Sequence, residues 1–119
     1  MRTMTKFNPQ ALIAGLAEGG ALPPVHPGEV LAEEFLAPLG LGTTRAARAL
    51  GVPRTRIERL VAGETAMTED TALRLEAWTG ASAEFWLALQ SNYNLRLARA
   101  RRDPSIAAIQ PAAPGAPPA

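Results

Sequence analysis

The sequence predicts an all-α protein built around one five-helix domain. Apolar residues recur with helical periodicity across 25–102, where no strand pattern is found. Within this region, the segment 43–62 has the residue spacing of a helix-turn-helix. We expect a flexible N-terminal arm at 1–24 before the domain. A disordered tail rich in Ala and Pro is expected at 103–119.

Each predicted helix has a recognisable beginning and end. Prolines open the first and third helices, and the hydroxyl residues Thr68 and Ser82 cap the fourth and fifth. Pro38 and Gly40 are expected to end the first helix, and glycines follow the next three. With their caps, the expected helices are 27–37, 43–51, 53–63, 68–80 and 82–99.

The helix-turn-helix prediction depends on three positions. Ala47 is small, which two steeply crossing helices require where they touch. Gly51 occupies the turn, where a positive φ is needed. Ile57 supplies the branched apolar side chain that packs the second helix onto the first. The alternative interpretation is a helical hairpin that binds nothing.

The orientation of the third helix indicates which of its side chains face DNA. If Ile57 and Leu60 face the core, Thr55 and Arg59 point away from it. Arginine can bond guanine with both ends of its guanidinium, and hydroxyls with free helix N-termini suit phosphates. The alternative for Arg54 is an ion pair with Glu58, four residues on. The predicted DNA-binding residues are Thr43, Thr44, Arg45, Arg54, Thr55, Arg56 and Arg59.

The charges are segregated although the formal net charge is only +1. The segment 43–60 holds five arginines and one acid, Glu58. The preceding helix carries Glu29, Glu33 and Glu34 and no base. A basic surface beside an acidic one indicates two different partners. The alternative for each surface alone is an ordinary solvated helix face.

Composition argues against catalysis and against a membrane. The chain has no cysteine and one histidine, so a zinc site of the usual His/Cys kind cannot form, and we expect no metal, no cofactor and no enzyme activity. His26 is expected to cap the first helix. No apolar run approaches the roughly 20 residues that span a bilayer, and the N-terminus makes a poor signal peptide. We therefore predict a cytoplasmic protein.

The fifth helix is apolar over more of its surface than one packing face needs. A helix-turn-helix protein that reads an inverted repeat in double-stranded DNA also requires a dimer. Both points predict a homodimer that uses this helix. The predicted interface residues are Trp86, Leu87, Tyr93 and Leu95.

Four segments resemble the HigA-type antitoxins, a branch of the lambda-repressor-like (XRE) helix-turn-helix proteins. They are HPGEVLAEEFLAPLGL (26–41), ALGVPRTRIERLVAGE (49–64), MTEDTALRLEAWTG (67–80) and SAEFWLALQSNYNL (82–95). The resemblance implies the antitoxin of a type II toxin–antitoxin, or addiction, module. Such an antitoxin silences a small basic RelE-like toxin that cleaves mRNA, and it represses their shared promoter.

Two departures from the family pattern concern the DNA surface and the N-terminus. Thr43 stands where lambda-repressor-like proteins often carry glutamine, which puts one phosphate or base contact in doubt. The arm at 1–24 is longer than the family's short leader, and Met4 is an alternative start to Met1.

The toxin-binding surface has two candidates. Carboxylates can cover a basic surface that holds mRNA, which favours Glu29, Glu33 and Glu34. The rival element is the arm at 1–24. Two alternative functions also remain: a stand-alone transcription regulator, and an interaction module that has lost DNA binding, against which the five arginines argue.

Overall fold

The computed structural model describes residues 24–112. The predicted arm therefore lies outside the described residues except for Pro24, as do the last seven residues of the predicted tail, 113–119. The described residues form helices and no strand, which confirms the all-α prediction. The elements are α2 (Pro27–Val30), η1 (Leu31–Leu36), α3 (Ala37–Leu39), α4 (Thr43–Leu50), α5 (Arg54–Val61), α6 (Glu69–Thr79), α7 (Ala83–Ala100) and α8 (Pro104–Ala107).

The first predicted helix is made of three consecutive segments, α2, η1 and α3. The middle one is a π-helix, and after it the Ala37 N–H donates to the Ala32 carbonyl, five residues back. The expectation that Pro38 ends this helix is wrong: the helix continues to Leu39, and Gly40, with a φ of +67°, ends it. Pro38 lies in the last turn, where its missing N–H removes a bond that the helix can lose without breaking.

The other predicted boundaries agree with the structure to within a residue. α4 runs from Thr43 to Leu50, and Gly51 follows it with a φ of +72°. The Thr68 and Ser82 hydroxyls accept hydrogen bonds from the third residues after them, as helix caps do. Pro53 differs slightly from expectation, because it caps α5 rather than forming its first residue.

Three aromatic rings of the core come from distant parts of the sequence, one from η1 and two from the beginning of α7. The ring of Trp86 lies 5.4 Å from that of Phe35 and 5.0 Å from that of Phe85, measured between centroids. Trp86 is completely buried within its own protomer. Its predicted place in a dimer interface is therefore wrong, because this side chain packs the beginning of α7 onto the rest of the domain.

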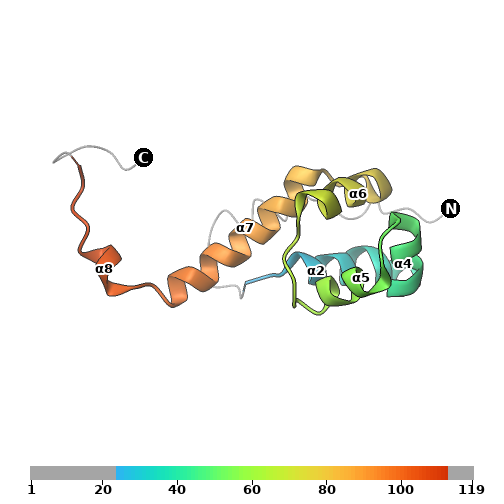
Figure 1. Ribbon diagram of the computed structural model, residues 1–119, viewed down its shortest axis with the longest axis horizontal. Helices are drawn as coiled ribbons and strands as arrows, with labels where there is room; N and C mark the ends of the chain where they lie inside the picture. The colour runs from blue at the N-terminus through green and yellow to red at the C-terminus, as the bar shows by residue number, and fades with distance from the viewer. Residues whose placement is uncertain (1–23, 113–119) are drawn as a thin grey trace.

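The end of α7 extends away from the rest of the molecule and leads to α8 (Figure 1). α8 is one short turn, in which the Asp103 carboxylate accepts a hydrogen bond from the Ser105 N–H at 2.8 Å. The described residues from 98 to 112 are all exposed. The segment 104–107 thus departs from the predicted disorder, although it buries nothing.

Among the described residues, no helix combines the length and the apolar character that crossing a membrane would need.

The beginning of α2 is defined by His26 and Gly28. His26 is the N-cap as expected, and its Nδ1 accepts a hydrogen bond from the Gly28 N–H at 2.9 Å. Gly28 lies directly against α5: a Cβ atom there would overlap the Leu60 carbonyl oxygen and come within 2.9 Å of the Val61 Cα. The two helix backbones can approach this closely only because residue 28 has no side chain.

Replacing Gly28 with alanine should therefore be strongly destabilising. The new methyl group meets backbone rather than a flexible side chain, so α2 and α5 must separate. We expect Gly28→Ala to lower the free energy of unfolding by at least about 3 kcal/mol, measured by urea denaturation. Gly42→Ala is the matched control, because a Cβ at Gly42 meets nothing within 4 Å. As a change at a helix N-cap it should cost no more than about 1 kcal/mol. Equal losses in the two variants would contradict this account.

Stability should also fall as His26 becomes protonated. Burial lowers the pKa of His26 below its usual value, against the opposing effects of a hydrogen bond with the Thr65 backbone and the charge of Glu29. The unfolded chain consequently takes up the proton at a higher pH than the folded chain. The free energy of unfolding should be greatest above the usual histidine pKa of 6.5 and decrease as the pH falls through the lowered value. Urea titrations between pH 7.5 and 5 measure this decrease, which should be smaller in His26→Asn because asparagine caps a helix without titrating there.

Candidate nucleic-acid interface

The two helices of the helix-turn-helix pack through small and branched residues, as the sequence predicted. Ala47 is 3% exposed and Ile57 is completely buried between α4 and the rest of the core. In the turn, the Val52 N–H donates to the Ala47 carbonyl at 3.0 Å after Gly51 has taken its left-handed conformation. With Ile57 and Leu60 buried, α5 presents its opposite face to solvent.

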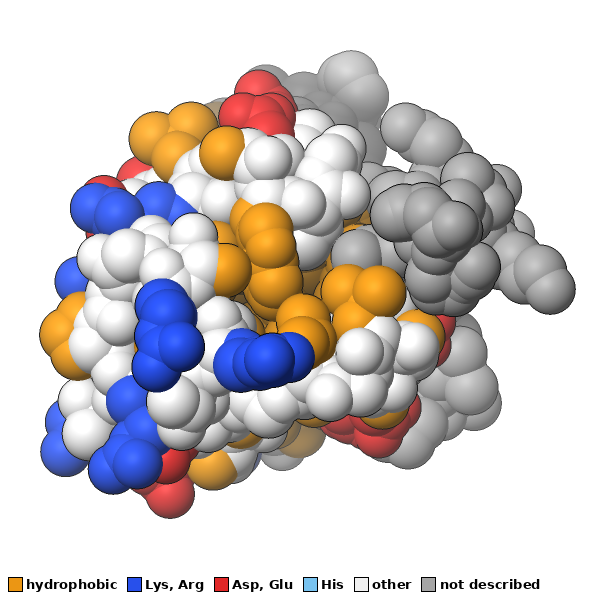
Figure 2. Space-filling model, turned by 90° about the vertical axis from the view of Figure 1, so that its right-hand side faces the viewer, with side chains coloured by type: hydrophobic (Ala, Val, Ile, Leu, Met, Phe, Trp, Pro, Cys, Tyr) orange, Lys and Arg blue, Asp and Glu red, His pale blue; other side chains and the backbone are white. Residues whose placement is uncertain are grey.

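Most of the predicted DNA-binding residues lie on that exposed side. Thr44, Arg45, Arg54, Thr55 and Arg59 are exposed, and Thr43 is half-buried. Figure 2 shows basic side chains close together over one part of the end of the molecule where α4 lies. Arg54 also pairs with Glu58 at 3.2 Å, so the alternative considered for it is present in this structure.

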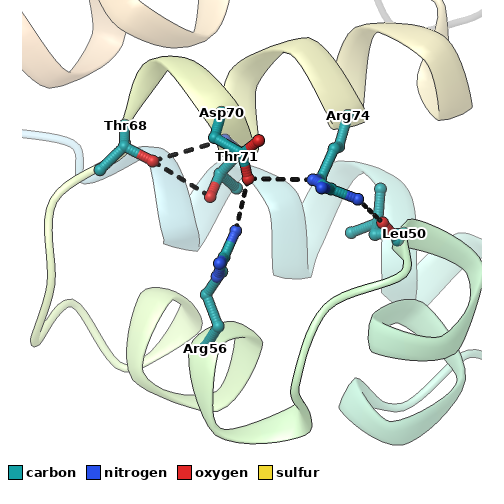
Figure 3. A network of polar contacts seen from close by, with 6 residues as sticks. All are labelled: Leu50, Arg56, Thr68, Asp70, Thr71 and Arg74. Atoms are coloured by element: carbon teal, nitrogen blue, oxygen red, sulfur yellow. Dashed lines mark hydrogen bonds and ion pairs between the residues drawn. The ribbon is translucent and has the colours of Figure 1, made fainter.

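Arg56 is the exception among these residues. Its guanidinium extends from α5 to α6 and bonds the Asp70 carboxylate at 2.7 Å (Figure 3). The same carboxylate oxygen accepts a bond from Arg74 Nε at 2.9 Å, and Arg74 also donates to the Leu50 carbonyl at 2.9 Å. Hydrogen bonds from Arg56 and then Arg74 hold the pKa of Asp70 below its usual range. Arg56 is exposed like Thr55 and Arg59, but its guanidinium is bonded to α6 within the protein.

Asp70 and Arg74 were not among the residues predicted for this surface. Their spacing of four residues, an acid before a base, is the signal that could have suggested a pair on one helix face. Nothing local indicates the bond to Arg56, which comes from a different helix.

A hollow of about 450 Å³ lies beside the exposed face of α5. Its lining combines guanidinium groups from α5 with hydroxyls from the loop and helix that follow. The lining residues are Pro53, Thr55, Arg56, Arg59, Thr65, Ala66, Thr68, Asp70 and Thr71. Asp70 is the one acid among them, and the hydroxyl and guanidinium donors are groups that bind phosphate oxygens.

The predicted acidic surface lies on the first helix. Glu29, Glu33 and Glu34 are all exposed. Glu29 and Glu33 line a second hollow, of about 390 Å³, together with His26 and Tyr93, whereas Glu34 lies outside it. The expectation that Glu29 and Glu33 share a face therefore agrees with the structure.

The remaining predicted interface residues on α7 have different surroundings. Leu87 is half-buried and packs against the core. Tyr93 is also half-buried, and its ring meets that of His26 edge-on at a centroid distance of 4.9 Å. Leu95 is 46% exposed, which makes it the most accessible of the predicted interface residues. Within the described part of the chain, no group of three His, Asp or Glu side chains is arranged to hold a metal ion.

No protein-family model matches the chain, but individual proteins do. It is 35% identical over 88 residues to antitoxin HigA-1 of Vibrio cholerae, a match that covers 74% of this chain and 83% of that protein. The chain belongs to the HigA family of antitoxins. It is also 44% identical over 77 residues to virulence-associated protein I of Dichelobacter nodosus, covering 65% of this chain and 71% of that one.

A solved HigA structure has the same fold. The Pseudomonas aeruginosa antitoxin HigA, determined with the higBA promoter, matches with a TM-score of 0.71 and 36% identity over 76% of this chain and 99% of that chain. Antitoxins and helix-turn-helix regulators are not enzymes, so membership of the HigA family confirms that prediction for this chain.

Proposed function

We propose that this HigA-family chain binds operator DNA through α4 and α5, represses its own operon and neutralises a RelE-like mRNA endonuclease toxin. The observation that carries the proposal is the exposed face of α5, on which Thr55 and Arg59 lie. A solved HigA with the same fold carries promoter DNA, which supports the same use of this face here. Because its proposed targets are operator DNA and a toxin that cleaves mRNA, we place its action in the cytoplasm.

Base reading and phosphate binding are assigned to different helices. Thr55 and Arg59 face outward on α5, where arginine can recognise guanine and threonine a base edge or methyl group. The N-terminus of α4 has no side-chain cap, so its backbone N–H groups suit a phosphate together with Thr44 and Arg45. Arg54 forms an ion pair with Glu58 and can also contact DNA. Thr43 is half-buried, and the Arg56 side chain is bonded to Asp70, so both are less available to DNA.

A homodimer follows from the proposed reading of an inverted repeat. Two copies must place α5 in successive major grooves, about 34 Å apart. We propose that the accessible part of α7 joins them, with Leu95 as its exposed apolar residue and Leu87 and Tyr93 at its margin.

Substitutions on α5 and α4 should affect DNA binding differently. Arg59→Ala should cost about 1–3 kcal/mol on the operator and relax specificity at one position, because it removes a base contact. Arg45→Ala should weaken binding to every sequence and flatten the salt dependence, because it removes a phosphate contact. Fluorescence anisotropy with upstream promoter fragments and scrambled duplexes measures both effects.

Arg102→Ala is the matched control for these variants, since Arg102 is an exposed arginine beyond the end of α7. It should leave both affinities unchanged. Equal losses on operator and scrambled DNA for Arg59→Ala and Arg45→Ala would refute the assignment, and a footprint without an inverted repeat would refute the dimer.

The acidic surface of the first helix is proposed to bind the toxin. Glu29 and Glu33 line one hollow and are four residues apart, so both can meet the same basic patch. Glu34 is exposed next to Glu33 and adds to the negative field. The arm before residue 25 is the competing element.

Reversing Glu29 and Glu33 to lysine should slow association with the toxin by about tenfold or more at low salt, because steering by opposite charge is lost. The toxin to use is the small basic product of the neighbouring reading frame, and stopped-flow mixing with growth rescue in cells gives the readouts. Glu84→Lys, an exposed reversal at the start of α7, is the control and should leave association unchanged. Operator binding should be the same in all three proteins. Full neutralisation by the double variant, with loss of neutralisation on deleting residues 1–24, would instead assign toxin binding to the arm.

The second candidate function is a stand-alone transcription regulator. Residues 43–63 have the same role in both cases, so the DNA surface does not distinguish them. Co-purification with the product of the neighbouring gene decides for the antitoxin.

A further inference from the structure

Asp70 brings a negative charge to the surface that we assign to DNA. Asp70 lines the hollow beside α5, where the other polar side chains are two arginines and four threonines. Phosphates are repelled by such a group, so on electrostatic grounds alone the surface would bind DNA more tightly without it. The acid at this place therefore needs an explanation other than a contribution to the affinity for DNA.

The bonds of Asp70 indicate what it does there. One oxygen accepts from both Arg56 at 2.7 Å and Arg74 at 2.9 Å. Arg74 comes from the same helix as Asp70 and also holds the Leu50 carbonyl at the end of α4. The carboxylate is thus positioned from two sides, and Figure 3 shows Arg56 reaching across from α5 to meet it.

This arrangement engages one arginine of the exposed side of α5 in a bond to α6. The Arg56 side chain is 41% exposed, so without its partner it would be free to turn toward a phosphate. Thr55 and Arg59 have no such restraint from α6 among the described contacts, and they remain on the outward side.

We propose that Asp70 is a specificity-determining residue of the DNA surface: it holds Arg56 against α6 and so withholds one guanidinium from the phosphates of non-cognate DNA. The inference rests on the proposed operator binding. Non-specific binding comes almost entirely from phosphate contacts, and a free arginine adds to it in every register. On the operator, base contacts fix how α5 docks, so a freed Arg56 gains less there.

The test compares wild-type protein and Asp70→Asn on an operator duplex and on a scrambled duplex of the same length and composition. Affinities are measured by fluorescence anisotropy between about 50 and 200 mM salt. Asp70→Asn should bind scrambled DNA about three- to tenfold more tightly, with a salt slope steeper by about 0.9, which corresponds to one added phosphate contact. Operator affinity should change by less than about twofold, so specificity falls.

Two further variants test whether the effect runs through Arg56. Glu69→Gln removes the same charge from the neighbouring exposed residue, for which the structure shows no bond to Arg56, and it should change neither affinity. Arg56→Gln/Asp70→Asn should bind scrambled DNA no more tightly than Arg56→Gln alone. An equal gain for Glu69→Gln, or a gain that persists without Arg56, would overturn the proposal.

Circular dichroism establishes that each variant is folded. If Asp70→Asn is not, Asp70→Ser replaces it, because serine is well tolerated where a helix begins. Equal gains on operator and scrambled DNA overturn the inference, and so does an unchanged specificity ratio in a protein whose wild type prefers the operator. A wild type without any preference overturns the proposed DNA reading itself, which separates the two failures.

Discussion

The contact between Gly28 and the backbone of α5 is the constraint on which the DNA surface depends. Because residue 28 has no side chain, the Leu60 carbonyl lies directly against α2, and the buried face of α5 is fixed there. The opposite face, with Thr55 and Arg59, is thereby directed outward. The neighbouring residues serve the same contact: His26 caps the helix at this point and Pro27 begins it. The short segment His26–Gly28 thus fixes how the first helix packs against α5.

The same first helix separates the two proposed binding surfaces. One side of it packs against α5, and another presents Glu29 and Glu33 around a hollow that His26 and Tyr93 complete. The segregation of charge along the sequence is therefore kept in three dimensions, since the basic residues of α4 and α5 and the acids of the first helix belong to different faces of one core.

The network around Asp70 shows how the charge of the basic surface is limited. Exposed ion pairs contribute little to the free energy of unfolding, so stability alone explains this group poorly. The network instead fixes the positions of the helices relative to one another. Arg56 joins α5 to Asp70 on α6, and Arg74 joins α6 to the end of α4. Arg56, Asp70 and Arg74 together link the three helices that frame the proposed DNA surface.

The sequence by itself determined what depends on neighbouring residues. The bounds of α4, the left-handed Gly51 and the caps Thr68 and Ser82 follow from local hydrogen bonds and local steric limits, and they agree with the structure. The outward direction of Thr55 and Arg59 followed from helical periodicity in the same way.

Only the tertiary structure decided what each side chain meets from a distant segment. Trp86 belongs to the core because Phe35, far earlier in the chain, lies against it. Arg56 turns toward α6 because Asp70 lies there, 14 residues away, and Gly28 is required because α5 crosses at that point. Such contacts depend on where separate helices come to lie after packing, and neither periodicity nor capping carries that information.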